Sequence, residues 1–262
     1  MTRLIRVELL KMRTVRMTWG LLAAAAGLTA LFSVIEASRA GSAGRIGPLS
    51  TASGLNAVIA GGVFALILAA VFGVTVSSGE FRHSTATQTY LAAPRRVRVL
   101  AAKTAAGACG GAVFGLVGYV IAAGVGLTFV AARGYHVAVG DATLARYAIG
   151  HVVAAALLAA IGVALGSLVR SQLAGVIGVF VWAIVIESIV GGLFNAVQPY
   201  LPYTAATTLA GTALGRAAFG PANGASTTAT PLPFAAATAL LAALAIAVSV
   251  LAARTTVRRD VT

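Results

Sequence analysis

Six long apolar stretches, separated by polar connections, constrain the fold of this 262-residue chain more than any other feature. A helix needs about 20 residues, each rising ~1.5 Å, to cross the hydrocarbon core of a bilayer. Stretches of this kind lie at 18–36, 55–77, 104–132, 144–169, 172–194 and 233–253. We therefore predict an all-α, polytopic membrane protein with six transmembrane helices.

The composition agrees with this prediction, because only 10% of the residues are charged, whereas a soluble domain carries about 25%. The six spans use most of the chain, so the connections leave no room for a separate soluble catalytic domain. An energy source other than an ion gradient would have to come from another polypeptide.

The formal net charge of +13 would suggest a nucleic-acid partner in a soluble protein, but here the basic residues follow the spans. Fourteen Lys and Arg lie in the amino-terminal segment, the second and fourth connections and the tail, and five lie in the alternate connections. Because cytoplasmic loops are rich in Lys and Arg, we predict that both termini are cytoplasmic. The topology thus accounts for the excess of basic residues, and we predict that no nucleic acid is bound. A cleaved signal peptide is disfavoured, since the first apolar run exceeds the ~7–15 residues of a signal sequence.

Residues 2–17 predict a helix with one basic side, covering about 140° of the helical wheel, and one apolar side. The basic side carries Arg3, Arg6, Arg13 and Arg16, and the opposite side carries Leu4, Ile5, Met12 and Val15. Glu8 and Lys11 interrupt the apolar side. Such a helix suits the cytoplasmic membrane interface. The alternative is a solvated basic flank that only sets topology.

The second connection, about 78–103, has the most varied side chains. Ser77 and Glu80 lie three apart, as in a capping box, which predicts a short cytoplasmic helix that begins here and ends before Pro94. Its mixture of aromatic, acidic and basic groups suits docking to another protein, whereas topology control would need only basic residues. The candidate docking residues are Glu80, Phe81, Arg82, His83, Tyr90, Arg95 and Arg96.

Glycines recur at spacings that favour close helix packing in the third and fourth spans. They are Gly107, Gly111 and Gly115 in the third span, and Gly162 and Gly166 in the fourth.

The connection at about 195–232 is rich in Pro, Thr and Gly and carries Arg216 as its one charge. We expect its larger apolar residues to rest on the outer membrane surface as short helices that cap a transport path. These residues are Leu201, Tyr203, Leu209, Leu214 and Phe219. The alternative is an irregular outer loop.

Glu187 is the one acidic residue well inside a predicted span, where an ionisable group needs a polar partner. By position it lies about 10 Å from the outer end of its helix, close to the depth expected for His151 on an antiparallel neighbour, so a contact between them is feasible. Two roles remain open for Glu187: a structural hydrogen-bonding group, or part of a translocation path.

The remaining sequence motifs predict no metal, no cofactor and no enzymatic activity. The three histidines fall in different parts of the predicted fold and lack acidic partners at ligand spacing. The chain also lacks a phosphate-cradling Gly-x-x-x-x-Gly-Lys loop, a Gly-x-Ser-x-Gly elbow and a His-Glu-x-x-His motif.

In the order of its motifs, the chain resembles the membrane subunits of bacterial ATP-binding cassette (ABC) transporters of the type-2 export permease family. The resemblance spans nearly all of the chain. It is carried by Glu8–Arg13 with Trp19-Gly20, by Ser78–Arg82 followed by Pro94–Arg96 and Ala102-Lys103, and by Val181-Trp182 through Glu187 to Tyr200–Pro202.

The resemblance implies an elbow helix at 1–17, a six-helix permease domain at 18–253 with a coupling helix at about 79–93, and a cytoplasmic tail at 254–262. It also implies a separately encoded ATPase subunit and a second permease copy or a related permease. Glu80 and Arg82 would then be transmission contacts.

The leading hypothesis is an ABC export permease in a bacterial plasma membrane, moving an amphipathic or hydrophobic drug, peptide or lipid, with multidrug resistance as one outcome. One alternative is a secondary transporter with Glu187 as proton carrier, although the chain lacks obvious inverted repeats. An intramembrane enzyme is a further alternative, for which only Glu187 and His151 come close to a catalytic pair.

Overall fold

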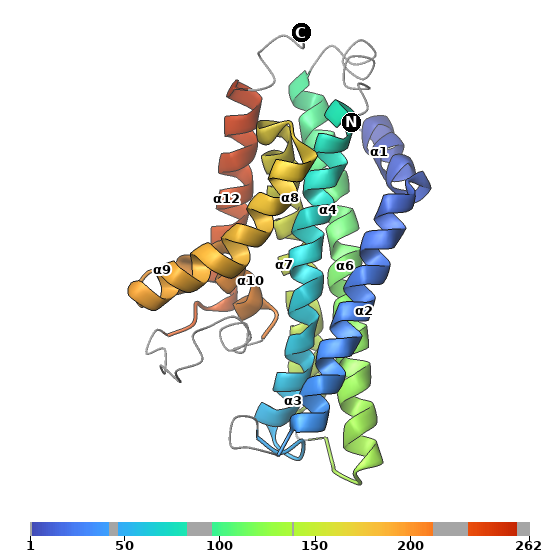
Figure 1. The fold of residues 1–262 in the computed structure, drawn as a ribbon, viewed down its shortest axis with the longest axis vertical. Helices are drawn as coiled ribbons and strands as arrows, with labels where there is room; N and C mark the ends of the chain where they lie inside the picture. The colour runs from blue at the N-terminus through green and yellow to red at the C-terminus, as the bar shows by residue number, and fades with distance from the viewer. Residues whose placement is uncertain (1, 42–46, 83–95, 138, 212–229, 256–262) are drawn as a thin grey trace.

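The computed structural model describes residues 2–41, 47–82, 96–137, 139–211 and 230–255, which are mostly helical and, within these ranges, form no strand. Six helical segments are long and apolar enough to cross a membrane, which confirms the predicted architecture. They form a bundle from which α9, the far end of the fifth span, points outward (Figure 1). The elements are α1 (Thr2–Thr14), α2 (Arg16–Arg39), α3 (Ala52–Ile59), η1 (Ala60–Gly62), α4 (Val63–Arg82), α6 (Arg96–Ala132), α7 (Asp141–Val169), α8 (Gln172–Phe180), η2 (Val181–Ile186), α9 (Glu187–Leu193), η3 (Gln198–Tyr200), α10 (Pro202–Leu209) and α12 (Phe234–Thr255).

The amino-terminal segment predicted as one helix over 2–17 is divided at Val15, whose backbone is extended. The indole of Trp19 donates a hydrogen bond of 2.9 Å to the carbonyl of Arg13. This bond satisfies a carbonyl that the end of α1 leaves without a helical partner, and it holds the corner between α1 and α2.

Helix α4 lies at the centre of the bundle, packed against α2, α6, α7 and α8. Glycines bring the neighbouring backbones close: Gly162 of α7 faces the backbone of Ala70, and Gly115 of α6 faces the backbone of His151. In lipid, apolar burial no longer drives helices together, so close backbone contact of this kind stabilises the bundle. The predicted packing role of these glycines is confirmed.

Two spans contain irregular turns that the apolar runs do not predict. The second span consists of α3, the 3₁₀ turn η1 and α4, and the fifth consists of α8, the π-helical segment η2 and α9. Such interruptions within helices often mark hinges or functional positions. The turn η1 lies between two carbonyls that accept hydrogen bonds from buried side chains of other helices. The segment η2 contains Trp182, which bonds to the buried Glu187 directly after it.

One end of the bundle gathers α1, the carboxyl end of α4, the amino end of α6 and the carboxyl end of α12 (Figure 1). At the opposite end, the guanidinium of Arg133 donates to the carbonyls of Ala37 and Ala40, at 3.2 and 3.3 Å. A cation at the carboxyl end of α2 also complements the helix dipole. This contact ties α2 to the end of α6.

The connection at 195–232 forms η3 and α10 in its described part. Leu201, Tyr203 and Leu209 are buried against the bundle, where α10 packs on α7 and α12. The expectation that these three side chains rest on a membrane surface is therefore wrong, because they fill the space between helices. Leu214 and Phe219 lie outside the described residues.

Candidate functional site

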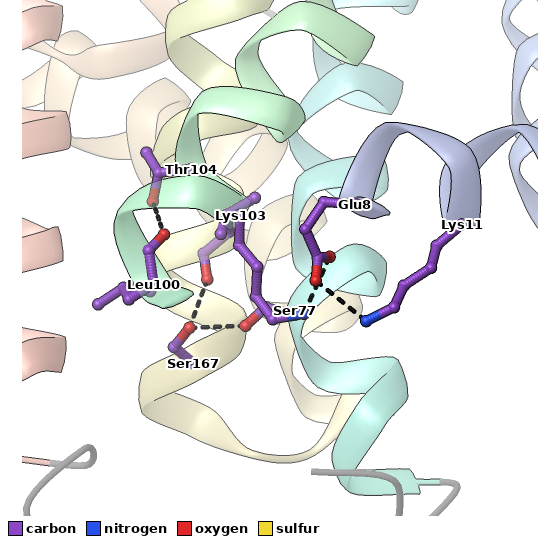
Figure 2. Close-up of polar contacts among 8 residues, drawn as sticks. Glu8, Lys11, Ser77, Leu100, Lys103, Thr104 and Ser167 are labelled. Atoms are coloured by element: carbon purple, nitrogen blue, oxygen red, sulfur yellow. Dashed lines mark hydrogen bonds and ion pairs between the residues drawn. The ribbon is translucent and has the colours of Figure 1, made fainter. Parts of the chain in front are cut away.

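A group of polar residues, which we call the loop-end cluster, joins four helices at the end of the bundle where α4 ends and α6 begins (Figure 2). It consists of Glu8, Lys11, Ser77, Lys103 and Ser167. The Glu8 carboxylate accepts from Lys103 Nζ at 3.1 Å and from Lys11 Nζ at 3.0 Å. Glu8 is 6% exposed and Lys103 is 4% exposed.

The two ion pairs of Glu8 differ in their surroundings. Lys103 lies inside the fold, whereas the Lys11 side chain is 44% exposed. A buried charge that loses its partner is strongly destabilising, while an exposed pair contributes little. The pair between Glu8 of α1 and Lys103 of α6 therefore fixes the position of α1 on the bundle together with Met12, Ile5 and Leu9, which pack against the core.

The serine pair fixes α4 to α7 at the same end. The hydroxyls of Ser77 and Ser167 lie 2.6 Å apart, and the Ser167 hydroxyl donates to the carbonyl of Val163. Ser78 donates to the carbonyl of Val74 within α4. The predicted capping box is therefore wrong: α4 continues through Ser77 and Ser78 to Arg82, and no helix begins there.

The structure places only some of the predicted docking residues. Glu80, Phe81 and Arg82 form the last turn of α4, and Arg96 is the first residue of α6. His83, Tyr90 and Arg95 lie outside the described residues, as does most of the predicted coupling helix. The helix ends that carry the placed residues lie at the same end of the bundle as α1 (Figure 1).

A second group, which we call the α10 cluster, consists of Trp182, Glu187, Tyr203 and Thr204. Glu187 is 5% exposed. Its Oε1 accepts from the Tyr203 amide at 2.7 Å and from the Trp182 indole at 3.1 Å. Its Oε2 accepts from the Thr204 amide at 2.8 Å and from the Thr204 hydroxyl at 3.0 Å.

The carboxylate of Glu187 thereby caps the amino end of α10 from a different helix. The first amides of a helix have no internal acceptors, and the helix dipole favours a negative charge beside them. The π-helical segment η2 places Trp182 and Glu187 close enough for their side chains to bond. Four hydrogen bonds thus occupy both oxygens of this carboxylate.

His151 is fully buried on α7 and is not bonded to Glu187. Its Nδ1 lies 2.9 Å from the carbonyl of Tyr147, and its Nε2 has no hydrogen-bond partner among the described residues. The contact between His151 and Glu187 that the sequence allows is therefore not made, because the Glu187 carboxylate bonds to Trp182 and to α10 instead. Within the described ranges, no three His, Cys, Asp or Glu side chains are grouped as metal ligands would be.

A family model described as an ABC-2 family transporter protein matches residues 4–186. The chain belongs to the ABC-2 transporter family. A search of curated proteins found no match to it. This ABC-2 protein is a multi-pass membrane protein and the membrane permease component of an ABC transporter. The loop-end cluster lies within the matched range, and Glu187 is the first residue beyond it.

Several residues of the ABC-2 permease that hold these clusters together were not identified from the sequence as site residues. Glu8 gave a signal, since it interrupts the apolar side of the predicted first helix. Lys103 is recognised in the sequence as a basic residue of the second connection and as part of the Ala102-Lys103 motif, but not as a partner of Glu8. Nothing in the sequence indicates that Ser77 and Ser167 form a pair, because 90 positions separate them and small hydroxyl residues are common within helices.

Proposed function

We propose that this permease exports an amphipathic or hydrophobic compound, such as a drug, peptide or lipid, with energy from ATP hydrolysed by a separate ATPase subunit. A second copy of the chain, or a related permease, completes the pathway. The complex resides in a bacterial plasma membrane, and its surrounding lipid contacts the apolar outer faces of the spans.

The observation that carries the proposal is the buried Glu8–Lys103 pair. Lys103 lies in the first turns of α6, directly after the segment where the ATPase would dock, and Glu8 lies on α1. The Ser77–Ser167 bond braces the helix on the other side of that segment. A force applied between α4 and α6 would therefore reach α1 and α7 as a rigid-body movement.

The orientation follows from the distribution of basic residues. Fourteen of nineteen Lys and Arg belong to segments predicted on one side, and the loop-end cluster lies on that side. We assign this side to the cytoplasm. Helix α1 then lies at the cytoplasmic interface, and α10 belongs to the outer half of the protein.

In this proposal, Glu80, Phe81, Arg82, His83, Tyr90, Arg95 and Arg96 contact the ATPase subunit and transmit its closure. ATP binding would shift the permease between inward-open and outward-open states, because the ATPase dimer binds the two states with different affinity. The permease itself contributes no catalytic group.

The alternative of a secondary transporter depends on Glu187 as a proton carrier. Its carboxylate accepts four hydrogen bonds, two of them from backbone amides at the start of α10. Protonation would remove an acceptor site and expose an amide without a partner. This arrangement favours a structural role for Glu187 and supports the ATP-driven permease.

The test is co-purification of the full-length permease with an ATPase that carries Walker motifs and is encoded beside it. We expect the double substitution Glu80→Ala and Arg82→Ala to abolish co-purification and permease-stimulated ATP hydrolysis. Arg146→Ala, an exposed change at the opposite end of the bundle, is the matched control and leaves both unchanged. Unchanged binding by the double variant would contradict the proposed docking site.

A further inference from the structure

The second span is interrupted at η1, and other elements bond to the backbone on both sides of the interruption. The hydroxyl of Ser33 on α2 donates to the carbonyl of Val58 at 3.0 Å. The hydroxyl of Tyr203 on α10 donates to the carbonyl of Val63 at 3.1 Å. Ser33 and Tyr203 are both buried.

Two glycines within η1 allow its backbone to lie against α2 and α7. A Cβ atom at Gly61 would meet Ser33, and one at Gly62 would meet the imidazole of His151. His151 Nε2 makes no hydrogen bond among the described residues, so the imidazole meets Gly62 by packing. Two side-chain hydrogen bonds thus reach this part of the second span, from Ser33 before η1 and from Tyr203 after it.

The position of η1 separates the short outer helix α3 from α4, which leads to the loop-end cluster. A 3₁₀ turn inside a long helix is a site where the helix can bend. Val63 is the first residue of α4, so a bend at η1 would carry the Val63 carbonyl with α4. Tyr203 would follow that carbonyl for as long as their hydrogen bond holds.

We propose that Tyr203 is a positioning residue that makes α10 follow α4 when the second span bends at η1. Its hydroxyl holds α4, while its amide is held by Glu187 on α9. Movement at the ATPase-facing end of α4 is thereby passed to α10 and to the fifth span. This inference rests on the proposed function for its physiological meaning, but the mechanical link is a property of the single chain.

The link is tested first by hydrogen–deuterium exchange of the full-length permease in lipid nanodiscs. Tyr203→Phe removes the hydroxyl and keeps the ring. Loss of one such bond predicts roughly five-fold faster exchange, both in peptides covering 56–67 and in peptides covering 202–209. Tyr200→Phe is the matched control, because Tyr200 is 57% exposed, and it leaves both segments at the wild-type rate.

The pattern of exchange decides the outcome. Faster exchange in both segments supports the link. Faster exchange in 202–209 alone, or in neither segment, overturns it, because α10 and the second span would then fluctuate independently. Ser33→Ala serves as a second variant: it should affect 56–67 and leave 202–209 unchanged.

A second experiment examines movement in the assembled transporter. Cys109 is the single cysteine of the chain, so Cys109→Ala gives a background in which Thr208→Cys reports on α10. We expect the rate of maleimide labelling at position 208 to change with ATP and vanadate. Tyr203→Phe should abolish that change, and Tyr200→Phe should retain it.

The two experiments separate failure of the link from failure of the proposed function. If no ATPase binds the permease, the proposed function fails, while the exchange data still decide the role of Tyr203. If the ATPase binds and Tyr203→Phe keeps the ATP-dependent change in labelling, the positioning role is overturned.

Discussion

Glu8 and Lys103 form a buried ion pair across 95 positions of the chain, with 3.1 Å between Oε2 and Nζ. The pair joins the amino-terminal helix to the start of the third span. Because both charges are buried, their mutual attraction offsets part of the cost of removing them from water. The amino-terminal helix is thus held by a specific polar contact in addition to its apolar packing against the core.

Substitution of Glu8 by Ala should lower the free energy of unfolding by about 3–5 kcal/mol, since it removes the carboxylate that compensates the buried Lys103 ammonium. Lys11→Ala, which removes the exposed partner of the same carboxylate, should lower it by less than about 1 kcal/mol. Both values can be measured by equilibrium unfolding of the purified chain in bicelles. The double variant Glu8→Leu with Lys103→Met should recover most of the loss, and equal instability of double and single variants would contradict the ion-pair explanation.

Glu187→Ala should loosen α10, because two amides and two side-chain donors lose their acceptor. We expect a loss of about 1–3 kcal/mol in the local stability of α10, read from exchange of peptides covering 202–209. Trp182→Phe removes one of the four donors and serves as the control, with a loss of about 1 kcal/mol or less. Equal exchange in the wild type and Glu187→Ala would show that α10 does not depend on this cap.

The six spans could be predicted from the sequence because their length and apolarity are local properties. Glycine packing could also be predicted, since the spacing that aligns Gly107, Gly111 and Gly115 on one helix face is visible in the chain. The bundle interior agrees with both predictions.

The clusters could not be predicted, because each depends on residues brought together by tertiary packing. Ser77 has the sequence pattern of a helix start, yet α4 continues through it to Arg82. The Ser77 hydroxyl bonds to Ser167 of another span instead of capping a helix. Glu187 was correctly expected to need a polar partner, but its partners are amides of α10, a helix whose position no local pattern reveals. His151 is expected at a similar depth, but the possible contact between it and Glu187 is not made.

Substitutions of Ser77 and Ser167 should have non-additive effects on the free energy of unfolding, because the two hydroxyls bond to each other. Ser167→Ala removes the hydroxyl that bonds to Ser77 and that donates to the Val163 carbonyl, so we expect a loss of about 1–2 kcal/mol. Ser77→Ala should cost about 1 kcal/mol. Because the two hydroxyls share one interaction, the double variant should lose less than the sum of the single variants in the same bicelle unfolding assay. Strict additivity would show that the bond contributes nothing to stability.

The contact between the third and fourth spans can be tested by making one change at two glycines of α6. Gly115→Ala places a methyl group against the His151 backbone and Ala155, so α6 and α7 must separate. We expect a loss of about 1–3 kcal/mol in the free energy of unfolding, the range for overpacking. Gly124→Ala meets no atom within 4 Å, and it should be neutral or stabilising by up to about 1 kcal/mol because alanine favours the helix. Both variants change Gly to Ala in the same helix, so a difference in their free energies of unfolding reports the close approach of α6 and α7. Equal stability of the two variants would contradict this close approach.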